Sequence, residues 1–176
     1  MILDILKFPD PFLKTKALPV ERVDDGIRKL IDDMIETMYK AKGIGLASVQ
    51  VGADRRVVVL DVPGDGDEER VQGRNLLALV NPEIVSSEGQ TIYEEGCLSV
   101  PGFTADVERF SKLTVRALDR DGKPIEVTAE GLFAIALQHE IDHIDGILFI
   151  DRLSRLKREM IKRRIKKSLE AGEKAL

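Results

Sequence analysis

At residues 139–143 the chain reads His139-Glu140-Ile141-Asp142-His143, and these two histidines are the only ones among its 176 residues. Histidines four positions apart lie on one face of a helix, about 6 Å apart along its axis at 1.5 Å per residue, so both can bind one metal ion. The glutamate beside the first histidine can then reach a metal-bound water and act as general base. The pattern therefore predicts a helix that carries a catalytic metal site.

The residues around this pattern are mostly apolar, which predicts that the helix is buried. They are Leu132, Ile135, Ala136, Leu137, Ile144, Ile147 and Leu148. A charged surface helix could show so short a motif without a metal. Inside a core, however, polar side chains without partners cost free energy. We therefore expect a metal ion to satisfy the buried histidines.

A third ligand decides the class of site. Zinc peptidases with this motif take a glutamate from a later helix, and Glu159 and Glu170 follow here, but in a basic stretch typical of a surface. Asp145 and Asp151 are further oxygen donors. Cys97, the only cysteine, lies in a segment that we expect to be irregular and turn-rich. Two histidines and a cysteine leave a fourth position open for water, which is a catalytic layout. A metallopeptidase with an acidic third ligand is the alternative.

Three segments stand out in order along the chain. They are Gly43-Ile44-Gly45-Leu46-Ala47-Ser48-Val49-Gln50, Glu95-Gly96-Cys97-Leu98-Ser99 and Gln138-His139-Glu140-Ile141-Asp142-His143. Their sequences and spacing resemble the peptide deformylase family over about residues 1–153, with Ser48 a departure from the expected alanine. The resemblance implies a hydrolase that removes the formyl group from N-formylmethionine at the N-terminus of newly made polypeptides.

The same resemblance implies that Cys97, His139 and His143 hold one divalent metal ion. Ferrous iron is the family's metal, although zinc, nickel or cobalt also suit a cysteine and two histidines. Glu140 would act as general acid and base on the metal-bound water that attacks the substrate.

Further residues gain roles in binding and stabilising the substrate. The resemblance assigns the side-chain amide of Gln50 and the backbone N–H of Leu98 to the developing oxyanion. Gly45 lacks a Cβ, so a substrate backbone can approach it closely. Leu132 and Ile135 share the ligand face of the helix and either line an apolar pocket for methionine or belong to the plain core. The resemblance adds Ile44 to that pocket.

Length and composition indicate one soluble domain. Apolar residues make up 43% of the chain and charged residues 33%, as in ordinary globular proteins. No apolar run approaches membrane-spanning length, and the first residues lack the pattern of a signal peptide. A single cysteine cannot form an internal disulfide, so we expect a reducing, cytoplasmic location and no membrane partner.

The net charge of −4 conceals two parts of opposite sign. From Asp151 to Ser168, nine Lys/Arg against two acidic residues give +7, which leaves −11 for the rest. Apolar residues at helical spacing in this stretch predict an amphipathic helix. We therefore divide the chain into a catalytic domain, 1–150, and a basic C-terminal helix and tail, 151–176. The helix is either a solvated surface element or a docking site for ribosomal RNA. A non-catalytic nucleic-acid or ribosome-binding module with structural histidines is a second alternative.

The expected fold class is α+β: a single domain of mostly antiparallel strands packed around the buried metal-binding helix, with a C-terminal surface helix. The predicted elements are a helix over about 24–41 capped by Asp24 or Asp25, strands over 57–60, 76–80 and 83–87, an exposed loop over 63–73, a hairpin of strands 112–118 and 124–128, and the metal helix over about 130–145. Asp142 points away from the metal in that helix and needs a cation, for which Arg109 is the candidate.

Overall fold

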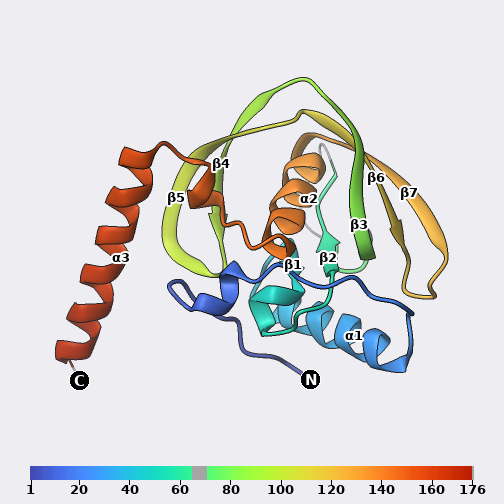
Figure 1. Ribbon diagram of the computed structural model, residues 1–176, viewed down its shortest axis with the longest axis horizontal. Coiled ribbons are helices and arrows are strands. Elements are labelled where there is room, and N and C mark those ends of the chain that lie inside the picture. The colour runs from blue at the N-terminus through green and yellow to red at the C-terminus, as the bar shows by residue number, and fades with distance from the viewer. Residues whose placement is uncertain (65–70, 176) are drawn as a thin grey trace.

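The computed structural model describes residues 1–64 and 71–175, and two antiparallel sheets enclose helix α2 in it (Figure 1). The larger sheet has the order β1-β2-β3-β6-β7, with strands Gly45–Ala47, Val57–Asp61, Leu76–Glu88, Lys112–Leu118 and Pro124–Glu130. The second sheet is a hairpin of β4, Thr91–Cys97, and β5, Val100–Arg109. The predicted α+β class with mostly antiparallel strands is confirmed.

The helices of the described residues include the two predicted over about 24–41 and 130–145. They are α1 Asp25–Lys40, α2 Gly131–Ile144 and α3 Arg155–Ala175, with short 3-10 helices η1 Pro11–Lys14, η2 Ser48–Val51 and η3 Phe149–Arg152. The backbone N–H of Ile27 donates to the Asp24 carboxylate over 3.0 Å, which caps α1 as expected. Beyond the end of α2, Gly146 adopts a left-handed φ of 77° that glycine tolerates.

Strand β2 lies at the centre of the fold because both of its faces are covered. Val58 and Leu60 pack in one cluster with α2, while Val57 and Val59 pack in another with α1. All four side chains are fully buried. A strand covered on both faces reads as a continuous apolar run instead of an alternating pattern. The run Val57–Leu60 therefore sets α1 and α2 on opposite faces of the sheet.

The β4–β5 hairpin covers the side of α2 that faces away from the large sheet (Figure 1). A third apolar cluster joins Val107 of β5 to Leu13 of η1, Phe149 of η3 and Ile165 of α3. The helix α2 is thus held between the two sheets, which is the buried position that its apolar flanks predict.

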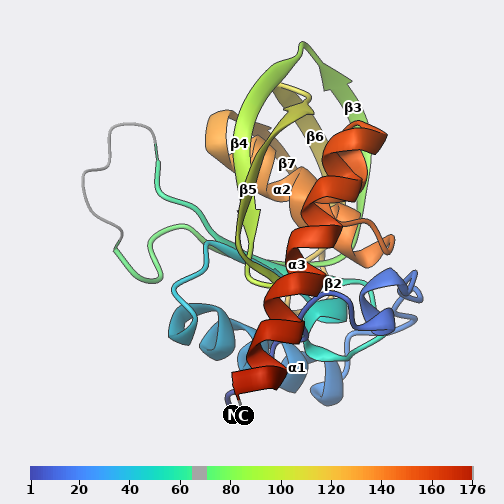
Figure 2. The same ribbon diagram turned by 90° about the vertical axis from the view of Figure 1, so that its left-hand side faces the viewer.

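Helix α3 stands beside the body as a surface helix, as predicted (Figures 1 and 2). Ile165 is buried against the third cluster, whereas Leu156, Met160 and Leu169 are 73%, 43% and 48% exposed. Within the stretch 151–176 the helix begins only at Arg155, because Arg152 belongs to η3. The division at residue 150 stays a prediction. None of the helices in the described ranges has both the length and the apolar character needed to cross a membrane.

Two local predictions differ from the structure. The two strands expected on either side of Asn81-Pro82 are one strand, β3, which continues through an irregularity where Asn81 has a φ of 53°. The Asn81 side chain pairs with both the N–H and the carbonyl of Val20, each over 2.8 Å, and this tertiary contact holds the bulge. The segment at Cys97, expected to be irregular and turn-rich, is so only in part: Cys97 is the last residue of β4, the pairing with β5 is irregular between Gly96 and Cys97, and Leu98 and Ser99 form the turn that follows. Of the loop expected at 63–73, residues 65–70 lie outside the described ranges.

We expect Gly146→Ala to destabilise the protein by more than the roughly 1–2 kcal/mol that a left-handed alanine costs. An added Cβ would overlap the backbone carbonyl of Lys14, and a backbone atom cannot move aside cheaply. Gly52→Ala is the matched control, since Gly52 has a φ of 79° but open space around it. Urea unfolding measures both variants. Equal losses would contradict the role of close packing at Gly146.

Candidate metal centre

Helix α2 presents three polar side chains of the predicted motif toward the end of β4. The helix is buried over most of its surface, polar side chains included, and Glu140 and His143 are 4% and 0% exposed. Strand β4 ends on Cys97, so the strand and the helix bring the three predicted ligands together from distant parts of the sequence.

The donor atoms of Cys97, His139 and His143 converge. The Cys97 sulfur lies 3.3 Å from Nε2 of His143, which lies 3.0 Å from Nε2 of His139. All three atoms lie within 4.8 Å of one another, in the one cluster of three such donors that residues 1–64 and 71–175 contain. Donors bound to one ion at about 2.0–2.3 Å lie a similar distance apart. The geometry fits a single metal ion.

The electrostatics of the buried groups around these donors bear on the same assignment. Oε1 of Glu140 and Nδ1 of His143 are the buried side-chain atoms that lack a hydrogen-bond partner in the described part of the chain. Burial lowers the pKa of His143 well below its ordinary value, which keeps the ring neutral as a ligand must be. Burial also opposes charge on His139, but hydrogen bonds with Cys97 and Glu95 raise its pKa well above the ordinary value. This part of the site therefore favours a cation.

A chain of charged groups orients His139. Its Nδ1 lies 2.8 Å from the Glu95 carboxylate, which accepts two hydrogen bonds of 2.7 and 2.8 Å from Arg109. Burial would raise the pKa of Glu95, but the bonds from Arg109 and His139 hold it below the ordinary value. Arg109 also donates to Asp142 over 2.7 Å, which confirms the predicted pair. Arg152 donates to the same Asp142 over 2.8 and 3.1 Å.

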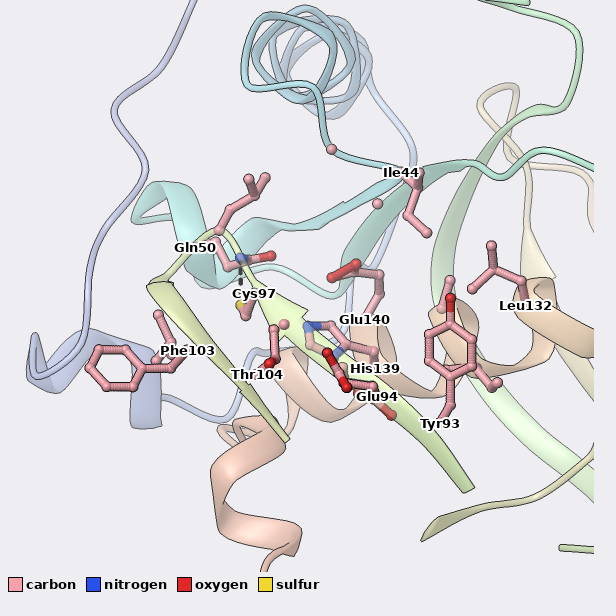
Figure 3. Close-up of a pocket in the computed structure, with 18 of the residues that line it drawn as sticks. Ile44, Gln50, Tyr93, Glu94, Cys97, Phe103, Thr104, Leu132, His139 and Glu140 are labelled. Carbon is pink, nitrogen blue, oxygen red and sulfur yellow. Dashed lines mark hydrogen bonds and ion pairs between the residues drawn. The ribbon is translucent and has the colours of Figure 1, made fainter. Parts of the chain in front are cut away.

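A cavity of about 650 Å³ opens beside the ligands (Figure 3). Nine of the ten predicted site residues line it: Ile44, Gly45, Gln50, Cys97, Leu98, Leu132, Ile135, His139 and Glu140. His143 lies behind them, fully buried. In Figure 3 Gln50, Cys97, His139 and Glu140 lie at the centre, with Ile44 and Leu132 to one side.

Two glycines leave room for neighbouring side chains. A Cβ at Gly45 would overlap the Glu140 carboxylate, and one at Gly43 would come within 2.8 Å of the Leu98 side chain. Gly45 was expected to leave space for a substrate backbone. In this structure the Glu140 carboxylate fills the space beside Gly45.

The amide of Gln50 is fixed by its surroundings. Its Oε1 accepts from the backbone N–H of Ala47 over 2.9 Å, so its NH₂ group points toward the cavity. There Nε2 donates to the Ser99 hydroxyl over 3.1 Å and lies 3.6 Å from the Cys97 sulfur. Gln50 is 2% exposed, and a buried amide with one oriented donor group is suited to bind a carbonyl oxygen.

The acidic candidates for a third ligand lie elsewhere. Asp145 pairs with Arg56 over 2.9 Å, and Asp151 accepts from the backbone N–H of Leu148 over 2.9 Å. Glu159 and Glu170 belong to α3, at the side of the molecule. The structure therefore does not support a site with an acidic third ligand.

Glu95 was not singled out as a site residue, although strand periodicity could have revealed it. Residues two apart on a strand share a face, so Glu95 lies beside Cys97 on β4 once the segment is recognised as a strand. Phe149 was also missed. Its ring stacks on His139 with centroids 6.3 Å apart, a contact between residues with no common sequence pattern.

Comparisons with known proteins show the family to which the chain is related. Residues 2–159 match the family model described as polypeptide deformylase. The chain is 55% identical to a peptide deformylase of Alkalilimnicola ehrlichii, over 97% of this chain and 93% of that one. It is 53% identical to one of Pseudomonas aeruginosa, over 94% and 95%.

Solved structures show the same likeness. A peptide deformylase from Legionella pneumophila is 50% identical, covers 98% of both chains and has a TM-score of 0.86. One from Ehrlichia chaffeensis in complex with actinonin is 40% identical, covers 95% of this chain and 97% of that one, and also has a TM-score of 0.86.

We expect Cys97→Ala and His143→Ala each to lose most of the bound metal, because each removes one of three donors. Glu159→Gln and Glu170→Gln should keep one ion per chain. Elemental analysis after anaerobic purification measures the content. Full occupancy in either ligand variant, or loss in a glutamate variant, would contradict the three-ligand site.

Proposed function

The chain belongs to the peptide deformylase family and is a metal-dependent hydrolase that removes the formyl group from nascent N-formylmethionyl polypeptides; we propose that Cys97, His139 and His143 hold its metal and that Glu140 transfers the protons. The convergence of the three donors beside an unpaired, buried Glu140 oxygen carries this proposal. A purely structural histidine pair would give no reason for that unpaired carboxylate.

We propose ferrous iron as the metal, on the basis of the family resemblance. Residues 97, 139 and 143 would supply one thiolate and two neutral imidazoles, a set that also suits zinc, nickel or cobalt. A bound ion of this kind acts as a Lewis acid and makes hydroxide available near neutral pH by lowering the pKa of water.

Glu140 is suited to accept and return a proton. Burial raises its pKa to about 7, so the carboxyl group can change protonation state near neutral pH. It would take the proton of the attacking water as the new C–O bond forms at the formyl carbon. It would then deliver that proton to the nitrogen as the C–N bond breaks, which releases formate and a free amine.

Gln50 and Leu98 would stabilise the negative charge that develops on the formyl oxygen. Supporting this proposal, the bond from Ala47 fixes the Gln50 amide with its donors toward the cavity. The turn at Leu98 is held from outside, since Lys7 donates to its carbonyl over 3.2 Å and Phe8 donates to that of Ser99 over 2.7 Å. Donors fixed in advance need no reorganisation during the reaction.

The methionine side chain would lie in the apolar part of the cavity. Ile44, just before β1, and Leu132 and Ile135 of α2 all line this cavity, which supports a binding role in addition to a core role. Gly45 would leave room for the Glu140 carboxylate beside the bound substrate.

We predict that the enzyme hydrolyses formyl-Met-Ala-Ser far faster than its acetyl analogue, because the extra methyl must fit where Gly45, Leu98 and the metal ligands crowd the carbonyl. The measured kcat/KM values for the two peptides decide this, and comparable values would point to a broader amidase.

The variant Glu140→Gln should keep its metal and lose about 10²–10⁴-fold in turnover, since an amide cannot carry the proton. A Glu140→Gln variant that keeps half of the wild-type activity would exclude Glu140 as the base.

We also propose that the enzyme works in the cytoplasm and that α3 docks on ribosomal RNA near the exit of the nascent chain. Between Arg155 and Lys167 the helix carries eight Lys/Arg against one acidic residue. None of them appears among the ion pairs found within the described ranges, and six of the eight are exposed. An unpaired basic face beside an acidic body suits a polyanion.

The double variant Arg163→Glu/Lys167→Glu should reduce co-sedimentation with ribosomes at low salt, and wild-type binding should weaken steeply as salt rises. Charge reversal is preferable to truncation, because removing α3 would also remove Ile165 from its apolar cluster. Arg22→Glu/Lys123→Glu changes the charge equally at exposed positions elsewhere and should bind normally. All forms should hydrolyse short formyl peptides. If the α3 variant co-sediments with ribosomes as well as the wild-type protein does, α3 is only a solvated helix.

A further inference from the structure

The 3-10 helix η3, Phe149–Arg152, contacts the metal centre at both of its ends. At one end the Phe149 ring is fully buried and stacks on the ring of His139, with an interplanar angle of 24°. At the other end Arg152 terminates the charged chain that leads back to His139. Neither contact belongs to the catalytic chemistry described above, and both act on the same ligand.

The charged chain alternates in sign from the ligand to the surface. His139 is followed by Glu95, Arg109, Asp142 and Arg152, joined by contacts of 2.7 to 3.1 Å. Exposure of the side chains is lowest in the middle, at 4% for Glu95 and 3% for Arg109, and then rises to 11% at Asp142 and 47% at Arg152. Arg152 is therefore the solvent-exposed end of this series of charged side chains, and it lies just before α3.

Asp142 depends on both arginines. Its Oδ2 accepts from Arg109 and Arg152, whereas its Oδ1 accepts from Arg152 alone among the hydrogen bonds found in the described ranges. Without Arg152, a largely buried carboxylate oxygen would lose its donor, which is unfavourable unless the side chain turns toward water. A second cavity of about 380 Å³, lined by Arg109, Asp142 and Arg152, gives it room to turn.

A rotation of Asp142 would loosen the groups behind it. The Asp142 carboxylate accepts a hydrogen bond from one terminal nitrogen of Arg109. The other two nitrogens of that guanidinium each donate to the Glu95 carboxylate. Glu95 in turn fixes the ring and tautomer of His139, and such outer contacts tune how tightly a ligand holds its metal.

We propose that Arg152 is a positioning residue for the metal centre, which it stabilises through Asp142, Arg109 and Glu95. Its role concerns the metal affinity and ligand orientation of the site proposed above, not a step in the reaction. Since α3 begins only three residues later, Arg152 also links the base of that helix to His139.

The test compares Arg152→Ala with Arg155→Ala, which removes the same charge from an exposed residue that makes no side-chain hydrogen bond or ion pair in the described part of the chain. The dissociation constant for Co²⁺, measured against a chelator, should rise by about tenfold in Arg152→Ala, the lower end of the usual outer-contact effect. The visible spectrum of the Co²⁺ form should also change. Arg155→Ala should match wild type in both. Arg152→Lys should recover only part of the affinity, because lysine lacks the fork geometry.

A lower melting temperature of Arg152→Ala with an unchanged Co²⁺ affinity and spectrum would overturn the proposal, because Arg152 would then be only structural. Equal effects in Arg155→Ala would overturn it as well, since net charge alone would explain them. Both readouts are made without substrate. A wild-type protein that binds Co²⁺ but fails to hydrolyse formyl peptides would therefore contradict the proposed function and leave this inference standing.

Discussion

Helix α2 buries a run of polar side chains, and contacts within the helix, such as the bond from Gln138 to the carbonyl of Ala134, do not satisfy all of them. Gln138, Glu140, Asp142 and His143 are at most 8% exposed. An unpartnered polar group in such a place costs about 1–3 kcal/mol. A helix with this sequence is therefore stable only where surrounding elements bring donors and acceptors to it.

Those partners come from elements far apart in the sequence. Gln138 exchanges hydrogen bonds with both the N–H and the carbonyl of Phe110, just after β5. Glu95 on β4 is hydrogen-bonded to His139, and Arg109 at the end of β5 donates a hydrogen bond to Asp142. The hairpin thus supplies three partners, which explains why it lies across α2 from the large sheet.

The atoms that the fold does not satisfy mark the place of the chemistry. Glu140 keeps one buried oxygen without a partner, beside a cavity and three convergent donors. A carboxylate with every oxygen paired would have a low pKa and would be a poor proton carrier, whereas burial without a partner raises the pKa of Glu140 to about 7. The low polarity of these surroundings makes charged groups costly to bury, and it also raises the pKa of the general base, Glu140.

Much of this could be read from local pattern. The spacing of His139 and His143 places two ligands on one helix face, whatever surrounds the helix. The apolar run at β2 predicts a strand covered on both sides, and the Asp119–Gly122 turn predicts its hairpin, β6–β7. The need of buried Asp142 for a cation identified Arg109, because a charge cannot be buried alone. Each of these follows from rules that act within a few residues or on a single side chain.

Other features were decided only when the chain closed on itself. The bulge at Asn81 exists because Val20, sixty-one residues earlier, pairs with its side chain. Gly45 is needed because Glu140 lies against it, and His139 is oriented by Glu95 and stacked on by Phe149. No periodicity relates these residues to one another. The sequence specifies the donors and the helix that bears them, but the partners of a buried polar group depend on which distant elements pack beside it, and only the tertiary structure determines that.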